Sequence, residues 1–94
     1  MYQIYWSAEA KDSYAAILQN VMGNFPVDVA LKMDDKVERL LNLLETNKHL
    51  CPPSRNFIDV RRCVITKHLS LTYRIAENDI ELVVFFDNRT DHPF

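Results

Sequence analysis

Basic side chains gather in the part of the chain between residues 55 and 74. This stretch has five basic residues and one acidic residue, Asp59, so its net charge is +4, whereas the whole chain carries −2. The basic residues are Arg55, Arg61, Arg62, Lys67 and Arg74. Guanidinium and ammonium groups bind phosphate and carboxylate. The stretch therefore indicates either a basic platform for an anionic partner, phosphate or an acidic peptide, or a sheet face whose charges only keep it solvated.

The last residues, 87–94, hold a second group suited to proton transfer. Arg89 closes the last predicted strand, and His92 follows it. Histidine acts as a general acid or base near neutral pH, and a neighbouring arginine can stabilise charge on a transferred phosphoryl group. The alternative is a frayed polar tail, because chain ends are commonly disordered.

Other site chemistries find little support in the residue types and their spacing. A metal site would draw on His49, Cys51, Cys63 and His68, but these lack the paired spacing of zinc ligands, so no metal or other cofactor is expected. The chain has no Gly-x-Ser-x-Gly motif, and one glycine excludes a glycine-rich phosphate loop. We expect the two cysteines to be small core residues or an inert loop thiol, and a disulfide between them stays open.

Length and composition indicate one globular domain over residues 1–94. Apolar residues make up 48% and charged residues 26% of the chain, which excludes a disordered protein. No apolar stretch approaches the roughly 20 residues of a membrane-spanning helix. The first residues lack the basic start and long apolar run of a signal peptide. We therefore expect a cytoplasmic protein with no membrane association.

A short strand and two helices are expected in the first half of the chain. The aromatic and β-branched stretch 2–6 predicts a strand, and Ser7 is placed to cap a helix. Gly23 and Asn24 should end that helix, because both tolerate the left-handed conformation. Pro26 should open a second helix that ends near Asn47. The apolar residues at helical spacing are Ala10, Tyr14, Ile17, Leu18 and Val21 in the first helix, and Ala30, Met33, Val37, Leu40, Leu41 and Leu44 in the second.

The second half of the chain is predicted to be sheet. The expected strands are residues 57–61, 63–67, 69–76 and 80–86, and residues 77–79 should form a hairpin turn. Together with the first half, this order predicts an α+β fold. An N-terminal strand and a two-helix hairpin should pack on a twisted, mainly antiparallel sheet of about four to five strands.

Alternation along these strands predicts which side chains share a face. Arg62, Val64, Thr66 and His68 should lie on one face, and Arg61, Cys63, Ile65 and Lys67 on the other. Leu69, Leu71, Tyr73 and Ile75 should form an apolar face opposite Ser70, Thr72, Arg74 and Ala76. Ile80, Leu82, Val84 and Phe86 should form one apolar face of the last strand.

Several stretches together resemble a known protein family. They are Tyr5-Trp6-Ser7-x-x-Ala10 before the first helix, Val60-Arg61-Arg62, Leu71-Thr72-Tyr73-Arg74-Ile75 and Val83-Val84-Phe85-Phe86-Asp87-Asn88-Arg89. In order and spacing they resemble the RelE/ParE superfamily of bacterial type II toxins over nearly the full length. The resemblance implies the same α+β fold, a cognate antitoxin that wraps the toxin, and growth inhibition by the free toxin.

The superfamily has two activities, and the resemblance implies site residues for one of them. RelE-like members cut mRNA on the ribosome without a metal, using basic residues, with a His or Tyr in some members, to activate the 2′-hydroxyl and stabilise the cleaved phosphate. ParE-like members instead inhibit DNA gyrase. We expect Arg62, Arg89, His92 and Lys67 to be catalytic, and Arg61, His68, Arg74 and Tyr73 to contribute to binding.

The net charge departs from the RelE-like pattern. Those toxins are usually strongly basic, as binding to ribosomal RNA demands, whereas this chain carries −2. On the basic sheet face and His92 we favour mRNA cleavage at the ribosome. A gyrase-inhibiting toxin, or a degenerate, non-toxic module that only binds an antitoxin, remains the alternative. Oligomeric state is left open.

Overall fold

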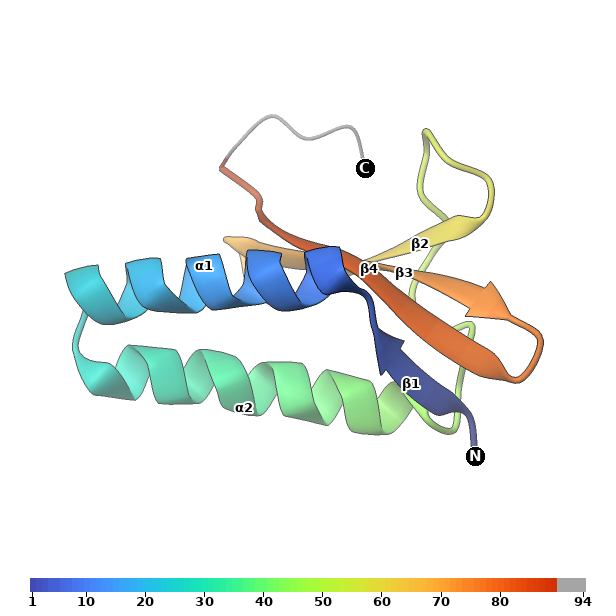
Figure 1. Ribbon diagram of the computed structural model, residues 1–94, viewed down its shortest axis with the longest axis horizontal. Helices are drawn as coiled ribbons and strands as arrows, with labels where there is room; N and C mark the ends of the chain where they lie inside the picture. Colours follow the sequence, from blue (N-terminus) through green and yellow to red (C-terminus); the bar gives the residue numbers. More distant parts are fainter. Residues whose placement is uncertain (90–94) are drawn as a thin grey trace.

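The computed structural model describes residues 1–89 and has two helices on one face of a four-stranded sheet (Figure 1). The elements are β1 (Gln3–Trp6), α1 (Ala8–Asn24), α2 (Val27–Leu44), β2 (Val60–Val64), β3 (Leu69–Ala76) and β4 (Asp79–Asp87). The strand order is β1-β4-β3-β2, in which β1 runs parallel to β4 and the other neighbours are antiparallel. The predicted α+β architecture with a mainly antiparallel sheet is confirmed.

Local sequence signals account for where the helices begin. Ser7 caps α1, since its Oγ accepts a hydrogen bond from the backbone N–H of Ala10 at 2.9 Å. Pro26 directly precedes α2, where its fixed φ suits a helix start. The first helix ends at Asn24, one of the two residues, Gly23 and Asn24, predicted to end it. The predicted left-handed conformation is wrong, because neither residue has a positive φ and the chain leaves the helix through an extended Phe25.

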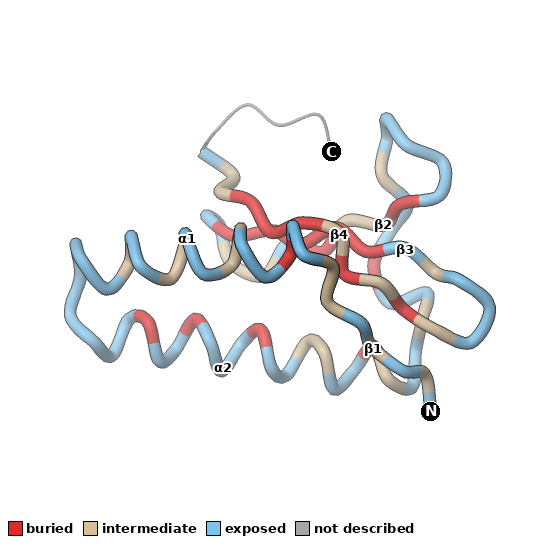
Figure 2. The backbone as a smooth tube through the Cα atoms, in the orientation of Figure 1, coloured by how far each residue is buried: buried red, intermediate tan, exposed pale blue. Residues whose placement is uncertain are grey.

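The core lies between the sheet and the helical hairpin. Buried residues follow β3 and β4 and one side of α2 (Figure 2). Trp6 stacks on Phe85, and Tyr14 of α1 contacts both rings. The helix-facing residues of β3 and β4 are Leu69, Leu71, Tyr73, Ile80, Leu82 and Phe85, all at most 2% exposed.

A β-bulge in β4 changes the predicted alternation of that strand. Thr72 pairs with Val84, but Tyr73 pairs with Leu82, so Val83 is an extra residue. Residues after the bulge therefore change faces. Phe85, predicted to lie opposite the apolar face, packs under the helices, while the predicted apolar pair Val84 and Phe86 lies on the far face of the sheet, away from the helices.

Two serines, one capping α1 and one within it, bind the backbone around the bulge. The Oγ of Ser7, the N-cap of α1, donates to the carbonyl oxygen of Val83 at 2.8 Å. The backbone N–H of Phe85 donates to the Oγ of Ser13 at 3.0 Å. Buried backbone groups need such partners when a bulge interrupts the ladder. The serines thus hold the helix at one register on the sheet.

The predicted strands 57–61 and 63–67 are one strand, β2, with irregular chain on both sides. Residues 65–68 form a turn, in which the N–H of Leu69 donates to the carbonyl of Thr66 at 3.3 Å. Two-residue alternation stops at Val64 for this reason, so Thr66 and His68 do not continue the face that carries Arg62. Before β2, Pro53 forms an isolated bridge with Arg61.

Cys51 and Cys63 form a disulfide with their Cα atoms 5.2 Å apart. Both residues are buried, as predicted for small core residues, but they are not free thiols. Spacing could not show the pairing, because a fold that brings a loop back along a strand is needed to join them. Within residues 1–89, neither helix combines the length and apolarity needed to cross a membrane.

Candidate functional site

Asn88, the residue after β4, joins three parts of the sheet's far face. Its Oδ1 accepts hydrogen bonds from Nη2 of Arg62 at 3.1 Å and from Oγ of Ser70 at 2.6 Å. Its Nδ2 donates to the carbonyl oxygens of Thr66 and Lys67, at 3.3 and 3.4 Å. A side-chain amide can make these contacts together because it donates and accepts at once.

Arg62 of β2 is half-buried and directed into this network. Its guanidinium carbon lies 5.0 Å from the ring centre of Phe86, a cation–π contact. Its Nε is enclosed and has no hydrogen-bond partner within the described part of the chain. We call Arg62, Ser70, Phe86 and Asn88 the Asn88 cluster. Two of the three guanidinium nitrogens of Arg62 therefore face other parts of the protein.

Only one end of the far face is the solvated polar surface that alternation suggested. Arg74 and Ala76 of β3 are exposed, whereas Ser70 and Thr72 are fully buried. The Oγ1 of Thr72 donates to the carbonyl oxygen of Val84 at 3.3 Å, and Ser70 contacts Asn88 as described. Because both hydroxyls have partners, the strand can bury them at little cost.

The turn of residues 65–68 presents two of the predicted site residues beside the cluster. Lys67 and His68 are both exposed. The backbone N–H of Asn88 donates to the carbonyl oxygen of His68 at 2.8 Å, which ties the turn to the end of β4. The N–H of His68 donates to Oγ1 of Thr66 at 3.1 Å and stiffens the turn.

Arg89 forms an ion pair with Asp87 at the end of β4. Three N···O distances lie between 2.6 and 3.1 Å, and they join both carboxylate oxygens to Nε and Nη2 of Arg89. The hydrogen bonds from Arg89 lower the pKa of Asp87 below its usual value, and Asp87 in turn raises the pKa of Arg89. The Arg89 side chain is 61% exposed, so the pair contributes little to stability.

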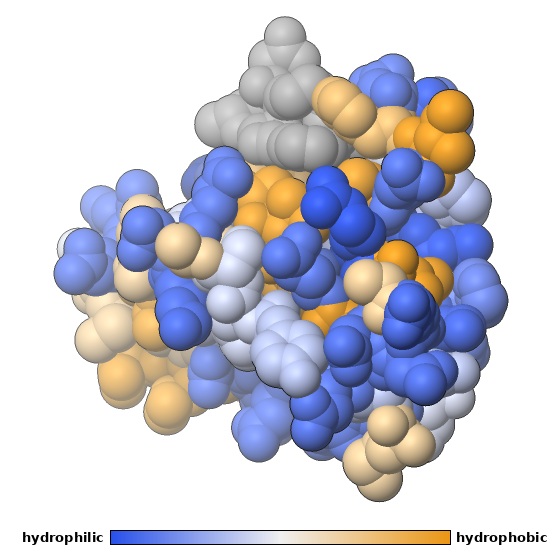
Figure 3. All heavy atoms as spheres, turned by 45° about the vertical axis from the view of Figure 1, so that its right-hand side comes forward, coloured by the Kyte–Doolittle hydropathy of each residue, from blue (hydrophilic) through white to orange (hydrophobic). Residues whose placement is uncertain are grey.

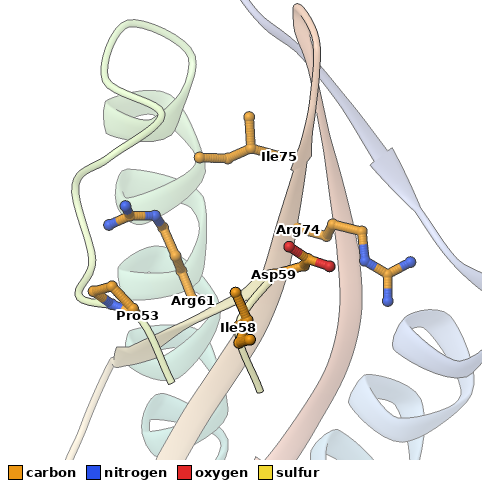
Figure 4. Close-up of a pocket in the computed structure, with 6 residues that line it drawn as sticks. All are labelled: Pro53, Ile58, Asp59, Arg61, Arg74 and Ile75. Atoms are coloured by element: carbon orange, nitrogen blue, oxygen red, sulfur yellow. The ribbon is translucent and has the colours of Figure 1, made fainter. Parts of the chain in front are cut away.

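Arg61 and Arg74 line an open hollow of about 380 Å³ at the edge of the sheet, with Pro53, Ile58, Asp59 and Ile75 (Figure 4). The two guanidinium groups point away from each other, with Asp59 between them. Arg61 donates to the carbonyl oxygen of Cys51 at 2.7 Å, and Arg74 pairs with Glu81 at 3.4 Å. The hollow therefore brings these two predicted binding residues together without aiming them at one ligand.

The remaining predicted residues lie elsewhere. Tyr73 is fully buried on the helix-facing side, where its hydroxyl donates to the carbonyl oxygen of Lys48 at 2.8 Å. Burial raises the pKa of Tyr73. His92 lies outside the described residues. The structure thus gathers Arg62, Lys67 and His68 around Asn88, and places Arg89 next to it.

Sequence reasoning did not single out Asn88 or Ser70. A polar residue between Asp87 and Arg89, directly after an apolar strand, was the available signal. Its partners come from strands and a turn far away in sequence, so the pattern alone could not identify them. Figure 3 shows hydrophilic residues over most of the surface in that view, with a larger apolar area at its lower left. No three metal-binding side chains come together within residues 1–89.

Comparisons with known proteins agree on the architecture. A family model described as the ParE toxin of the type II toxin–antitoxin system parDE matches residues 4–93. No curated protein matches the chain in sequence. Solved structures with the same fold include the chromosomal ParDE toxin–antitoxin system of P. aeruginosa, with a TM-score of 0.77 and 16% identity over 93% of this chain and 96% of that one.

Two further structures show the same fold at similar distance. The YoeB/ParE toxin of Agrobacterium tumefaciens has a TM-score of 0.67 and 13% identity, covering 90% of this chain and 97% of that one. YafQ of E. coli has a TM-score of 0.66 and 14% identity, covering 95% and 96%.

Proposed function

This chain belongs to the ParE toxin family of type II toxin–antitoxin systems, and we propose that it arrests growth by binding a protein, DNA gyrase, and not by cutting RNA. The proposal rests on the position and the hydrogen bonds of the Arg62 guanidinium group. A phosphate clamp needs guanidinium N–H groups that face outward and are free to pair with the anion. Here Nη2 is bonded to Asn88 and Nε is enclosed, while the guanidinium covers Phe86.

The ion pair of Arg89 supports the same conclusion. Asp87 occupies two guanidinium nitrogens of Arg89, Nε and Nη2, that would otherwise meet a phosphate, and its negative charge repels an incoming anion. The chain's net charge of −2 adds to this, because RNA binding gains its affinity from positive charge. Without a free anion clamp, the toxin would act through the surface it presents to another protein.

A cognate antitoxin is the second partner of this proposal. The end of the helical hairpin exposes large apolar side chains that a partner would cover. They are Met22, Phe25, Val27 and Leu31, each at least 50% exposed. In this proposal the antitoxin keeps the toxin inactive in the cytoplasm, the compartment in which the target acts.

A specific observation favours mRNA cleavage as a second candidate. Lys67 and His68 are exposed on a turn that Asn88 holds beside Arg89, so basic groups do gather at one end of the sheet. In that mechanism Lys67, or His92, would remove the proton of the 2′-hydroxyl, and the arginines would hold the phosphate. Arg89 would first have to exchange Asp87 for the phosphate.

Induced expression without antitoxin separates the two candidates. Growth, plasmid supercoiling by purified gyrase with added toxin, and primer extension on a translated reporter mRNA are measured for wild type and Arg89→Ala. Arg39→Ala is the matched control, because Arg39 is an exposed arginine paired with Asp35 on α2. We expect arrest and loss of supercoiling without discrete mRNA cuts. Cuts that disappear in Arg89→Ala but persist in Arg39→Ala would establish cleavage instead.

A further inference from the structure

The disulfide joins a loop to the middle of an edge strand. Cys63 lies in β2 on the helix-facing side, opposite Leu71 of β3. Cys51, 12 positions earlier, begins the irregular segment 51–59 that returns along the outer edge of β2. We propose that Cys51–Cys63 is a reversible thiol–disulfide site that controls how firmly this segment is held against β2.

Hydrogen bonds also hold the start of the segment. The carbonyl oxygen of Cys51 accepts from Nη1 of Arg61 at 2.7 Å, and the N–H of Cys51 donates to the hydroxyl of Tyr73 at 3.3 Å. The carbonyl oxygen of Pro52 accepts from the N–H of Arg62 at 3.0 Å, and the N–H of Ser54 donates to Val60 at 2.7 Å. The prolines at 52 and 53 have no N–H, so the segment cannot continue a full ladder along the edge. Residues 55–59 are exposed. The disulfide therefore adds a covalent restraint to these hydrogen bonds at the start of the segment.

The segment also forms one wall of a hollow beside the candidate site. This hollow of about 380 Å³ lies between residues 52–56 and the side chains of Arg62 and Val64. Pro52 contacts the backbone of Arg62, whose side chain belongs to the Asn88 cluster. When the disulfide opens, the wall loosens and the hollow next to Arg62 changes shape. The redox state of the two cysteines therefore affects the shape of the surface around the candidate site.

The chemistry is ordinary thiol–disulfide exchange with a dithiol. A thiolate of the dithiol attacks one sulfur of the Cys51–Cys63 bond, forming a mixed disulfide and releasing the other cysteine as a thiolate, which takes up a proton. The second thiol of the reductant then displaces the remaining cysteine. The protein gains two thiols, and the dithiol is oxidised to its own disulfide. Cys51 is 7% and Cys63 2% exposed, so the attack requires segment 51–59 to lift first.

Hydrogen exchange measured by mass spectrometry tests the proposal on the full chain. The oxidised protein is compared with protein reduced by dithiothreitol and with the double variants Cys51→Ser/Cys63→Ser and Cys51→Ala/Cys63→Ala. We expect the amides of Ser54 and Arg62 to exchange about tenfold faster or more after reduction, and equally fast in both double variants, with α1 and α2 unchanged. Dithiothreitol should have no effect on the double variants, and iodoacetamide should label both cysteines of the reduced protein under native conditions.

Three results would overturn the proposal. If no thiol is labelled until the chain is unfolded, the bond is a permanent cross-link. If exchange of segment 51–59 is the same in oxidised and reduced protein, the bond does not restrain it. If reduction exposes the amides of α1 and α2 as well, the disulfide is needed for the whole fold. The reduced wild type decides among these even where the double variants fail to fold, and none of the readouts depends on the toxin's target.

Discussion

Arg62 and Asn88 are 26 positions apart in sequence, yet Nη2 of Arg62 donates to Oδ1 of Asn88 at 3.1 Å. The same oxygen accepts from Ser70, and the amide nitrogen reaches back to the turn before β3. One side chain therefore connects β2, β3 and the turn between them to the end of β4. This network directs the guanidinium of Arg62 inward, so it decides which cations are left at the surface.

Asn88→Ala should lower the free energy of unfolding by about 1–3 kcal/mol, because it leaves Ser70 and Arg62 without a buried partner. For a domain of this size that corresponds to a melting temperature lower by roughly 4–8 °C for each kcal/mol. Urea denaturation, monitored by the fluorescence of Trp6, measures the change in the free energy of unfolding. The control Asn42→Ala removes an exposed amide on α2 and should not destabilise the protein. Equal stability of the two variants would contradict the role given to Asn88.

Ser13→Ala should destabilise the junction between α1 and the bulge in β4. It removes the partner of the Phe85 N–H, a group that is buried in the core. An unsatisfied buried donor costs about 1–3 kcal/mol. Thermal unfolding of Ser13→Ala is compared with that of the control Thr46→Ala. The exposed hydroxyl of Thr46 donates a long hydrogen bond of 3.4 Å to Leu43, so its removal should cost less than about 0.5 kcal/mol. A Ser13→Ala protein as stable as Thr46→Ala would show that the bulge finds another partner.

Gly23→Ala should stabilise the protein by about 0.4–1 kcal/mol, because alanine reduces the freedom of the unfolded chain. Gly23 lies inside α1 without a positive φ, and an added Cβ would meet no atom within 4 Å. The reverse change, Ala16→Gly, at an exposed position of the same helix, should cost about as much. Chemical denaturation of both variants is the measurement, and a destabilised Gly23→Ala would mean that this turn of the helix needs glycine.

Stability should fall in alkaline solution through Tyr14. Burial raises the pKa of Tyr14, and its hydrogen bond to Asp34 at 2.5 Å raises it further. The folded state thus favours the neutral phenol. This contribution is complete below the unfolded pKa, about 10, and is lost as pH rises from there toward the folded pKa.

Tyr14→Phe removes that contribution. Its unfolding free energy should fall less steeply above pH 10 than that of wild type. Absorbance titration at the tyrosinate band, taken as the difference between the two proteins, gives the Tyr14 curve directly. A difference curve with its midpoint near pH 10 would contradict the raised pKa.

Helix starts and element order could be predicted because their causes are local. Ser7 caps α1 through a hydrogen bond to a residue three positions on, and apolar spacing marks both helices. The strands 69–76 and 80–86 were predicted nearly to their observed ends. Propensity and alternation act within a few residues, and they can be read without knowing the partners.

The candidate site depended on contacts that the chain makes only when folded. The bulge at Val83 moved Phe85 to the core and Phe86 beneath Arg62, because register is set between strands and not within one. Asn88 meets Arg62, and Cys51 meets Cys63, only after the sheet has formed in the order β1-β4-β3-β2. Amino-acid order alone therefore specified the helices, most strands and the family. Tertiary packing decided which arginines face inward and which cysteines join, since both follow from juxtapositions between residues distant in sequence.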